Sequence, residues 1–299
     1  MSGPTTLSTV LASPSLSTLL RQKALSSQAV SFAYADVSPV HKAFAPMVRK
    51  QAYDLCELAV VTCLQAIAYA RPVVLLPIVV ASRFQRGCLI TRREHGVSAP
   101  EALAGKRIGV RAYTQTTGMW VRAHLVEDYG LATDGMHWLT RDPAHVEQYQ
   151  DPCFVEHDAT GKSLAQLLCD GDVDAAIFGN DLPDDDAFVP VIPDARDRDL
   201  QWWQRHGFVP INHMVVASLD RCRRDPAAVK EAYGLVKDVI HQAAAPAGQP
   251  QLISAGFQQL GAPLAWIIDA CLEQRLLPRK LSLEEVFGPA EKLLGGLID

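Results

Sequence analysis

The sequence predicts an α/β protein built as two lobes with a ligand cleft between them. Segments with strand-like and helix-like apolar spacing alternate along most of its 299 residues, which favours largely parallel sheets with helices on both faces. The middle segment contains a β-α-β-α-β unit of its own, and a later strand leads back to the first part. Because the chain crosses twice between the parts, we expect lobe I over 1–100 plus 213–299, and lobe II over 101–212.

Short apolar runs predict the elements of lobe I. Leucines at helical spacing follow a serine cap at the first helix, while Pro46 interrupts a later short helix. The segment that starts at residue 52 is ambiguous at first and then helical up to about residue 70. In chain order, strands are expected over 6–12, 28–35, 73–80 and 87–93, and helices over 15–25, 41–51 and up to about 70.

Lobe II is predicted to begin with a helix start. Ser98 and Glu101 have the spacing of a capping box, with Pro100 in the first turn. Strands are then expected over 107–110, 137–140 and 173–179, and helices over 117–129 and 162–170. A strand near residue 215 returns to lobe I, and the remaining chain from 224 to 299 is predicted to be almost wholly helical.

Composition argues against several classes of partner. The net charge is −5, whereas proteins that bind nucleic acids normally carry a basic stripe. A nucleic-acid partner is therefore not expected. The seven cysteines are scattered without a CxxC pair, which is typical of reduced thiols in a cytoplasm. The N-terminus has no signal-peptide pattern, and the most apolar run, Val73 to Ala81, is too short to span a bilayer. We therefore expect a cytoplasmic protein without a membrane or nucleic-acid partner. Composition does not decide whether the protein forms a homo-oligomer.

The stretch GKRIGVRAYTQTTGMWVR, residues 105–122, predicts an anion site at a strand-to-helix junction. The strand ends at Arg111, and the following helix begins near Thr116 or Thr117. A helix N-terminus offers unpaired N–H groups, and the nearby guanidinium and the Thr114 hydroxyl add donors for a carboxylate or phosphate. In the alternative interpretation, a threonine merely caps the helix and the arginine pairs with a surface acid.

Motifs for several other chemistries are absent from the sequence. It contains no GxxxxGK[ST] loop, no GxGxxG after a strand and no GxSxG elbow. It also lacks HExxH and any Cys/His spacing typical of a metal site. We therefore expect no nucleotide loop, no acyl-enzyme hydrolase, no metal and no cofactor.

Two further segments supply candidate site residues. SRFQRG places Arg83 and Arg86 just after an apolar strand, where they could clamp a second carboxylate or lie in a solvated loop. RHGFVPINHMVV brings Asn212 and His213 into the returning strand, where the histidine is either a proton donor and acceptor or a core residue bonded to backbone. Glu57 is either a helix-start acid or a ligand contact.

Taken in this order, GVRAYTQTTGMWVR, YDLCELAVVTCLQA, SRFQRG and RHGFVPINHMVV resemble the 4,5-dihydroxyphthalate decarboxylase family. That family is similar to type 2 periplasmic binding proteins turned into cytoplasmic enzymes. The resemblance runs from about Thr6 to the Asn212–His213 strand and, more weakly, into the helical tail. It implies a two-lobed type 2 periplasmic-binding-protein-like fold and a small aromatic polycarboxylate in the cleft. It also implies loss of CO2 from a substrate such as 4,5-dihydroxyphthalate, giving protocatechuate.

For this reaction we hypothesise a role for each candidate residue. His213 would be the catalytic acid and base, with Glu57 as its partner. The substrate would be held by Arg83, Arg86, Arg111, Thr114, Thr116, Thr117 and Asn212. One departure concerns the segment that in relatives resembles RFxRH: the histidine expected there is missing, and Arg86 and Gly87 stand in its place.

Three other functions share parts of this pattern. A non-catalytic solute-binding protein for an aromatic or sulfonated acid has the same fold, but transport normally requires export. The effector domain of a transcription regulator would need a helix-turn-helix, which the segment before the first αβ unit is too short to hold. An enzyme that makes a pyrimidine or quinone precursor is the third alternative, because fold alone does not determine function.

Overall fold

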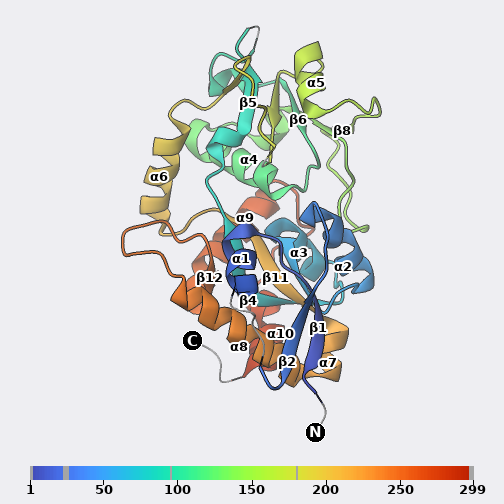
Figure 1. Ribbon diagram of the computed structural model, residues 1–299. Coiled ribbons are helices and arrows are strands. Elements are labelled where there is room, and N and C mark those ends of the chain that lie inside the picture. Colours follow the sequence, from blue (N-terminus) through green and yellow to red (C-terminus); the bar gives the residue numbers. More distant parts are fainter. Residues whose placement is uncertain (1–2, 23–26, 95, 180, 296–299) are drawn as a thin grey trace.

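The computed structural model describes residues 3–22, 27–94, 96–179 and 181–295 and folds them into two α/β lobes, one above the other in Figure 1. Each lobe is built on a six-stranded sheet. The predicted α/β class with two lobes is therefore confirmed. The predicted helix over 15–25 ends, as far as the structure describes it, at Gln22, and residues 23–26 of that prediction lie outside the described residues.

The sheet of lobe I has the strand order β12-β4-β11-β3-β1-β2. Its strands are β1 (Thr5–Val10), β2 (Val30–Tyr34), β3 (Leu55–Ala59), β4 (Val73–Ser82), β11 (Ile211–Ser218) and β12 (Ser254–Ala255). Strand β1 is parallel to β2 and β3, whereas β11 runs antiparallel between β3 and β4. The carboxyl ends of β1, β2, β3 and β4 consequently meet at one edge of the sheet, which faces lobe II.

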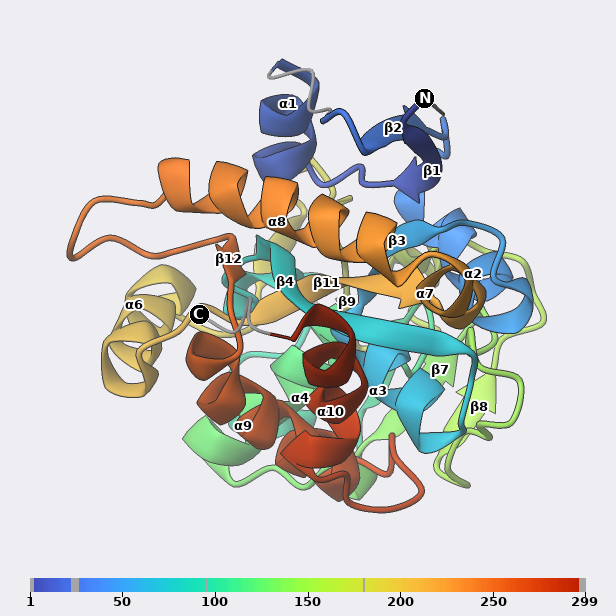
Figure 2. The same cartoon turned by 90° about the horizontal axis from the view of Figure 1, so that it is seen from below.

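Helices cover both faces of the lobe I sheet. Figure 2 shows α8 (Pro226–Gln242) across one face, with α1 (Pro14–Gln22) beside it. On the other face lie α3 (Val60–Ala68) and α10 (Leu283–Leu294). The shorter helices α2 (Phe44–Lys50) and α7 (Leu219–Arg224) complete the lobe. This double covering explains why the long apolar strand β4 is almost completely buried.

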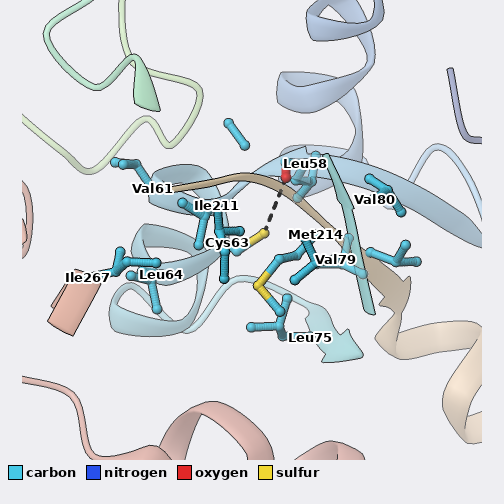
Figure 3. Close-up of a cluster of buried hydrophobic side chains, with 14 of the residues drawn as sticks. Leu58, Val61, Cys63, Leu64, Leu75, Val79, Val80, Ile211, Met214 and Ile267 are labelled. Atoms are coloured by element: carbon cyan, nitrogen blue, oxygen red, sulfur yellow. Dashed lines mark hydrogen bonds between the residues drawn. The ribbon is translucent and has the colours of Figure 1, made fainter. Parts of the chain in front are cut away.

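The core beneath α3 fixes the orientation of β11. Met214 is fully buried and packs with Cys63, Leu75 and Val79 in Figure 3. The Cys63 thiol donates to the carbonyl oxygen of Leu58 at 3.8 Å. Because side chains alternate along a strand, the neighbours of Met214 point to the opposite face of the sheet, toward the start of α1. His213 is one of these neighbours.

The sheet of lobe II has the order β10-β5-β9-β6-β7-β8. Its strands are β5 (Leu89–Arg92), β6 (Arg107–Val110), β7 (His137–Thr140), β8 (Val155–His157), β9 (Ala175–Ile177) and β10 (Phe188–Pro190). Helices α4 (Thr116–Tyr129) and α5 (Leu164–Asp170) cover it, and α6 (Ala195–His206) packs on α4 through Trp202.

The predicted boundary of lobe II at residue 101 needs correction. Strand β5 pairs with β9 and β10, so the chain already enters lobe II between Ser82 and Leu89. It returns between His206 and Ile211, close to the predicted position. The predicted capping box is also wrong, because the segment at Pro100–Leu103 is a 3-10 turn whose N-cap is Ala99. Helix α6 was not predicted.

The helical tail contacts both lobes, although it was assigned to lobe I. Helix α9 (Gly261–Glu273) lies beside α4, where the rings of Trp266 and Trp120 stack with centroids 4.7 Å apart. Just after α9, Gln274 Oε1 accepts a hydrogen bond of 2.7 Å from the buried guanidinium of Arg122. The tail therefore joins lobe I to the helix whose first turn faces the cleft.

Candidate active site

A cavity of about 730 Å³ lies where the two lobes face each other. This volume is within the range of small-molecule sites. Lobe I contributes residues from the carboxyl ends of β1, β2, β3 and β4 and from the start of β11. Lobe II contributes residues that follow β6 and β9. The position agrees with the general rule that ligands of α/β sheets bind beyond the carboxyl ends of strands.

A histidine–carboxylate pair forms the lobe I side of the cavity. His213 Nδ1 lies 2.9 Å from Glu57 Oε1. In the ladder between β3 and β11, Glu57 is opposite Val215 and Ala59 is opposite His213, so both functional side chains share one face of the sheet. The His213 side chain is 22% exposed and lines the cavity, whereas Glu57 is completely buried behind it.

Glu57 is held as an anion by four hydrogen bonds. Besides His213, the backbone N–H groups of Ala12 and Ser13 donate to Oε2 at 2.7 and 2.8 Å, and the Ser13 hydroxyl donates to Oε1 at 2.7 Å. Burial by itself raises the pKa of Glu57, but the bonds from His213 and Ser13 outweigh burial and lower the pKa below its ordinary value of 4.5. An ionised Glu57 accepts from His213, so the proton of the imidazole stands on Nδ1 in this pair.

This environment predicts a pH-dependent contribution of Glu57 to stability. Replacing Glu57 by glutamine is expected to lower the free energy of unfolding at pH 7 by about 1–3 kcal/mol, because the amide cannot accept all four bonds. Since the pKa is lower in the folded state, the stabilisation is present above pH 4.5 and is lost as the pH falls through the folded pKa. Urea midpoints of both proteins should differ at pH 7 and approach each other as the pH falls below 4.5. A constant difference would contradict an ionised Glu57.

On the lobe II side, Arg83 is fixed against the first turn of α4. Its Nη2 donates to the Thr117 hydroxyl at 2.8 Å, and its Nη1 donates to the carbonyl oxygen of Gly179 at 3.0 Å. The Thr116 hydroxyl accepts from the backbone N–H of Val61 at 3.4 Å, across the cleft on α3. The N-cap of α4 is Gln115, so neither threonine is the cap residue. Instead, the Thr117 hydroxyl binds Arg83, and the Thr116 hydroxyl binds the backbone of α3.

Arg111 contacts a histidine of the opposite lobe. Its Nη1 lies 2.8 Å from His41 Nδ1, and its Nε lies 3.6 Å from a carboxylate oxygen of Asp142. The side chain is 31% exposed, and burial lowers the pKa of Arg111, although the nearby carboxylates act in the opposite direction. Arg111 thus adds a second cation to the cavity wall.

Two more histidines complete the cavity lining. Burial, followed by the charge of Arg111, lowers the pKa of His41 and lowers that of His145 to about 3. His145 Nδ1 lies 2.9 Å from the hydroxyl of Thr62. The Phe44 ring packs edge-on at 5.3 Å from both His145 and His213. Neutral imidazoles therefore line the cavity between the His213–Glu57 pair and Arg111.

The structure brings most of the predicted site residues together. The predicted residues that line the cavity are Arg83, Arg111, Thr114, Thr116, Thr117, Asn212 and His213. Asn212 accepts a hydrogen bond from the amide of Gln85. Glu57 lies behind His213 in the lobe I sheet, and the proposal that it starts a helix does not match its place within β3.

Arg86 does not match its predicted role. It is not among the described residues that line the cavity, and its buried guanidinium bonds to Asp128 and Asp199, each with a closest N–O distance of 2.8 Å. The neighbouring Gly87 also faces away: a Cβ built there would lie 4.0 Å from the Cβ of Ala195 on α6. A histidine at position 87 would therefore point toward α6 rather than into the cavity.

Sequence reasoning missed Ser13, His41 and His145. His41 lies in the 3-10 turn Val40–Ala43, and its segment had only been assigned to a helix. Ser13 precedes α1, and a serine at this place is an ordinary helix cap. His145 lies in a loop between β7 and β8. The only available signal was that Ser13 and His41 follow predicted strands, which places them at the same sheet edge as Arg83.

Among the described residues, no group of three or more His, Cys, Asp or Glu side chains could hold a metal ion. Within the same ranges, no helix combines the length and the apolar character that a membrane span needs.

Two curated proteins share sequence with this chain, and both are named 4,5-dihydroxyphthalate decarboxylase. The protein from Comamonas testosteroni is 27% identical over 173 residues, which are 54% of this chain and 52% of that protein. The protein from Pseudomonas putida is 29% identical over 133 residues, 42% of this chain and 52% of that protein. The predicted resemblance is confirmed. The chain spans about half the length of the curated relatives it matches. No family model matches it.

Solved structures confirm the type 2 periplasmic-binding-protein-like fold. The alkanesulfonate-binding protein SsuA from Xanthomonas axonopodis pv. citri, bound to MOPS, has a TM-score of 0.57 at 14% identity, covering 96% of this chain and 99% of its own. The aliphatic sulphonate-binding SsuA from Escherichia coli has a TM-score of 0.54 at 13% identity, and the match covers 95% of this chain and 97% of SsuA. A DSZB mutant in complex with biphenyl-2-sulfinic acid has a TM-score of 0.55 at 18% identity, and the match covers 96% of this chain and 99% of the mutant.

Proposed function

We propose that this protein is a carboxy-lyase that removes CO2 from a hydroxylated aromatic dicarboxylate without a cofactor. The proposed substrate is 4,5-dihydroxyphthalate, and the products are protocatechuate and CO2. The observation that carries the proposal is the pairing of His213 with the buried Glu57, opposite Arg83 and Arg111, around one cavity. The similarity to two 4,5-dihydroxyphthalate decarboxylases supports the same reaction.

The two lobes have complementary roles in the proposal. The guanidinium groups of Arg83 and Arg111 attract the acid groups of the ligand, and the bonds of Arg83 to Thr117 and Gly179 hold it in place. On lobe I, ionised Glu57 accepts the hydrogen bond of His213 Nδ1 and fixes the orientation of the imidazole. This bond leaves Nε2 on the other side of the ring to give a proton to the ligand.

The proposed reaction replaces a ring carboxylate by a proton. The hydroxyl para to this carboxylate loses its proton, and the electron pair on oxygen moves into the ring. His213 Nε2 then gives a proton to the carbon that bears the carboxylate. The bond to CO2 breaks, its electron pair restores the aromatic ring, and the oxygen regains a proton. The net change consumes one proton, which His213 takes up again from solvent, and releases one CO2.

Incubation with three ligands tests the proposal. The panel is 4,5-dihydroxyphthalate, 4-hydroxyphthalate and phthalate, with CO2 release and product mass as the measurements. We expect CO2 from the first two, in which a hydroxyl stands para to a carboxylate, and none from phthalate. Absence of CO2 from all three would refute the proposed function.

The second candidate function is a solute-binding protein for an aromatic carboxylate. It is favoured by the shared fold of SsuA, whose two structures are of sulfonate-binding proteins. Its signature in the same experiment is tight binding of a panel member that is recovered with unchanged mass.

Arg83 provides a separate test of substrate binding. Replacing Arg83 by glutamine is expected to raise KM for 4,5-dihydroxyphthalate by about 10- to 100-fold, because a charge-assisted hydrogen bond contributes roughly 1.5–3 kcal/mol. Replacing the exposed Arg196 on α6 by glutamine is the matched control and should leave KM unchanged. Steady-state CO2 release measures both. A KM within twofold of the unchanged protein would remove Arg83 from the binding wall.

A further inference from the structure

His41 occupies a position in the cavity that the proposed reaction leaves unassigned. It lies in the 3-10 turn Val40–Ala43, between β2 and α2, on the lobe I side. Its partner Arg111 directly follows β6 on the lobe II side. The 2.8 Å contact between His41 Nδ1 and Arg111 Nη1 therefore joins opposite walls of the cavity.

The partner determines which nitrogen of His41 carries the proton. An arginine side chain has donors and no acceptor, so Arg111 donates and His41 Nδ1 accepts. Nδ1 consequently bears a lone pair, and the proton of the neutral ring stands on Nε2. This is the opposite tautomer to His213, whose Nδ1 donates to Glu57. His41 Nδ1 thus has a lone pair that can accept a proton, whereas the Nδ1 proton of His213 is held by Glu57. His213 gives a proton from Nε2 only in the form that carries a proton on both ring nitrogens.

We propose that His41 Nδ1 is the proton acceptor for the ring hydroxyl of the ligand, an inference that rests on the proposed decarboxylation. A ring that enters between the two walls takes the Arg111 donor for its own oxygens and leaves the lone pair of Nδ1 open. The hydroxyl O–H bond breaks and its proton moves to His41, while His213 protonates the carbon para to it. After CO2 has left, His41 returns its proton to the oxygen, so His41 is unchanged over one turnover.

The surroundings of His41 keep its base form available. Facing it are the cations Arg111 from lobe II and Lys42 from its own turn, and the carboxylates Asp142 and Asp181 from lobe II loops. Burial and Arg111 together lower the pKa of His41 from 6.5, more than the two carboxylates raise it. The charge of Arg111 also stabilises the oxygen anion that forms when the hydroxyl loses its proton.

The other lining histidine is less suited to this role. His145 Nδ1 is engaged with the hydroxyl of Thr62, and its pKa of about 3 makes it a far weaker base. The Phe44 ring separates it from His213, with 5.3 Å to each imidazole. Among the three histidines that line the cavity, His41 has its Nδ1 lone pair directed at an arginine of the opposite wall.

Replacing His41 by glutamine tests this inference. Glutamine can accept a hydrogen bond but cannot take up a proton, so kcat for 4,5-dihydroxyphthalate is expected to fall by about 10²–10⁴-fold. The acid limb of the kcat/KM profile, expected below pH 6.5 in the unchanged protein, should disappear. The inhibition constant of phthalate, which has no hydroxyl, should stay within about twofold. Replacing the exposed His241 by glutamine is the matched control.

The outcomes separate this inference from the proposed function. If the unchanged protein releases CO2 and the H41Q protein does so at a similar rate, His41 is not the acceptor, although the proposed function stands. A loss of kcat accompanied by an equal loss of phthalate binding would show a merely structural role and also overturn it. If the unchanged protein releases no CO2 from any hydroxylated phthalate, the proposed function fails, and this inference fails with it.

Discussion

Replacing His213 by glutamine is expected to lower kcat for decarboxylation by about 10²–10⁴-fold, the usual contribution of a positioned proton donor. The lost step is protonation of the ring carbon, for which His213 is the proposed donor. Glutamine keeps a donor for the buried carboxylate of Glu57, which lies 2.9 Å from the imidazole in the structure. KM should change little, because the arginines on the opposite wall remain. Steady-state CO2 release gives both constants.

The control for this prediction is a histidine of similar chemistry outside the cavity. His157 at the end of β8 is exposed, so its replacement by glutamine should leave kcat unchanged. Circular dichroism and the urea midpoint establish that the H213Q protein is folded. A folded H213Q protein with kcat within threefold of the unchanged protein would exclude His213 as the proton donor and would leave Glu57 with a structural role alone.

Local pattern was enough to predict most strands of both sheets. Strands were predicted over 73–80 and 107–110 from their apolar residues, and the structure forms β4 and β6 there. The lobe to which a strand belongs is a different question. Leu89–Arg92 was assigned to lobe I because the boundary was placed at residue 101, but its partners are β9 and β10. Strand pairing is decided by contacts between distant segments, which the local sequence does not contain.

The candidate site also depends on contacts between distant segments, which the local sequence does not contain. His213 and Glu57 are 156 residues apart. His213 was identified by its chemistry and its place in the predicted returning strand, and Glu57 as an acid before a predicted helix. Arg86 was identified on the same grounds and was misplaced, because the acids that bind it come from α4 and α6. Helix α6 was not predicted, so its aspartate could not be considered. His41 was missed because nothing near it in the sequence indicates that it meets Arg111.

The ion cluster around Arg86 explains what this arginine does in place of binding the ligand. Its Nε and Nη2 donate to the two carboxylate oxygens of Asp128 at 2.8 and 3.2 Å, and its Nη1 donates to Asp199 at 2.8 Å. Arg86 is only 1% exposed and Asp199 only 2%. Asp128 belongs to α4 and Asp199 to α6, so the guanidinium joins the two helices to the crossing between the lobes.

Replacing Arg86 by methionine is expected to lower the free energy of unfolding by about 3–5 kcal/mol, because the buried carboxylate of Asp199 and its neighbour Asp128 lose their cation. Methionine keeps much of the apolar stem, so the loss reports the charge rather than a cavity. The matched control is the exposed Arg93, whose replacement by methionine should change stability by less than about 0.5 kcal/mol. Urea unfolding measures the stability of both variants.

KM of the folded R86M protein should stay near that of the unchanged protein, since Arg86 is not among the described residues that line the cavity. A stable R86M protein with a KM raised tenfold or more would instead return Arg86 to the ligand, as the sequence first suggested.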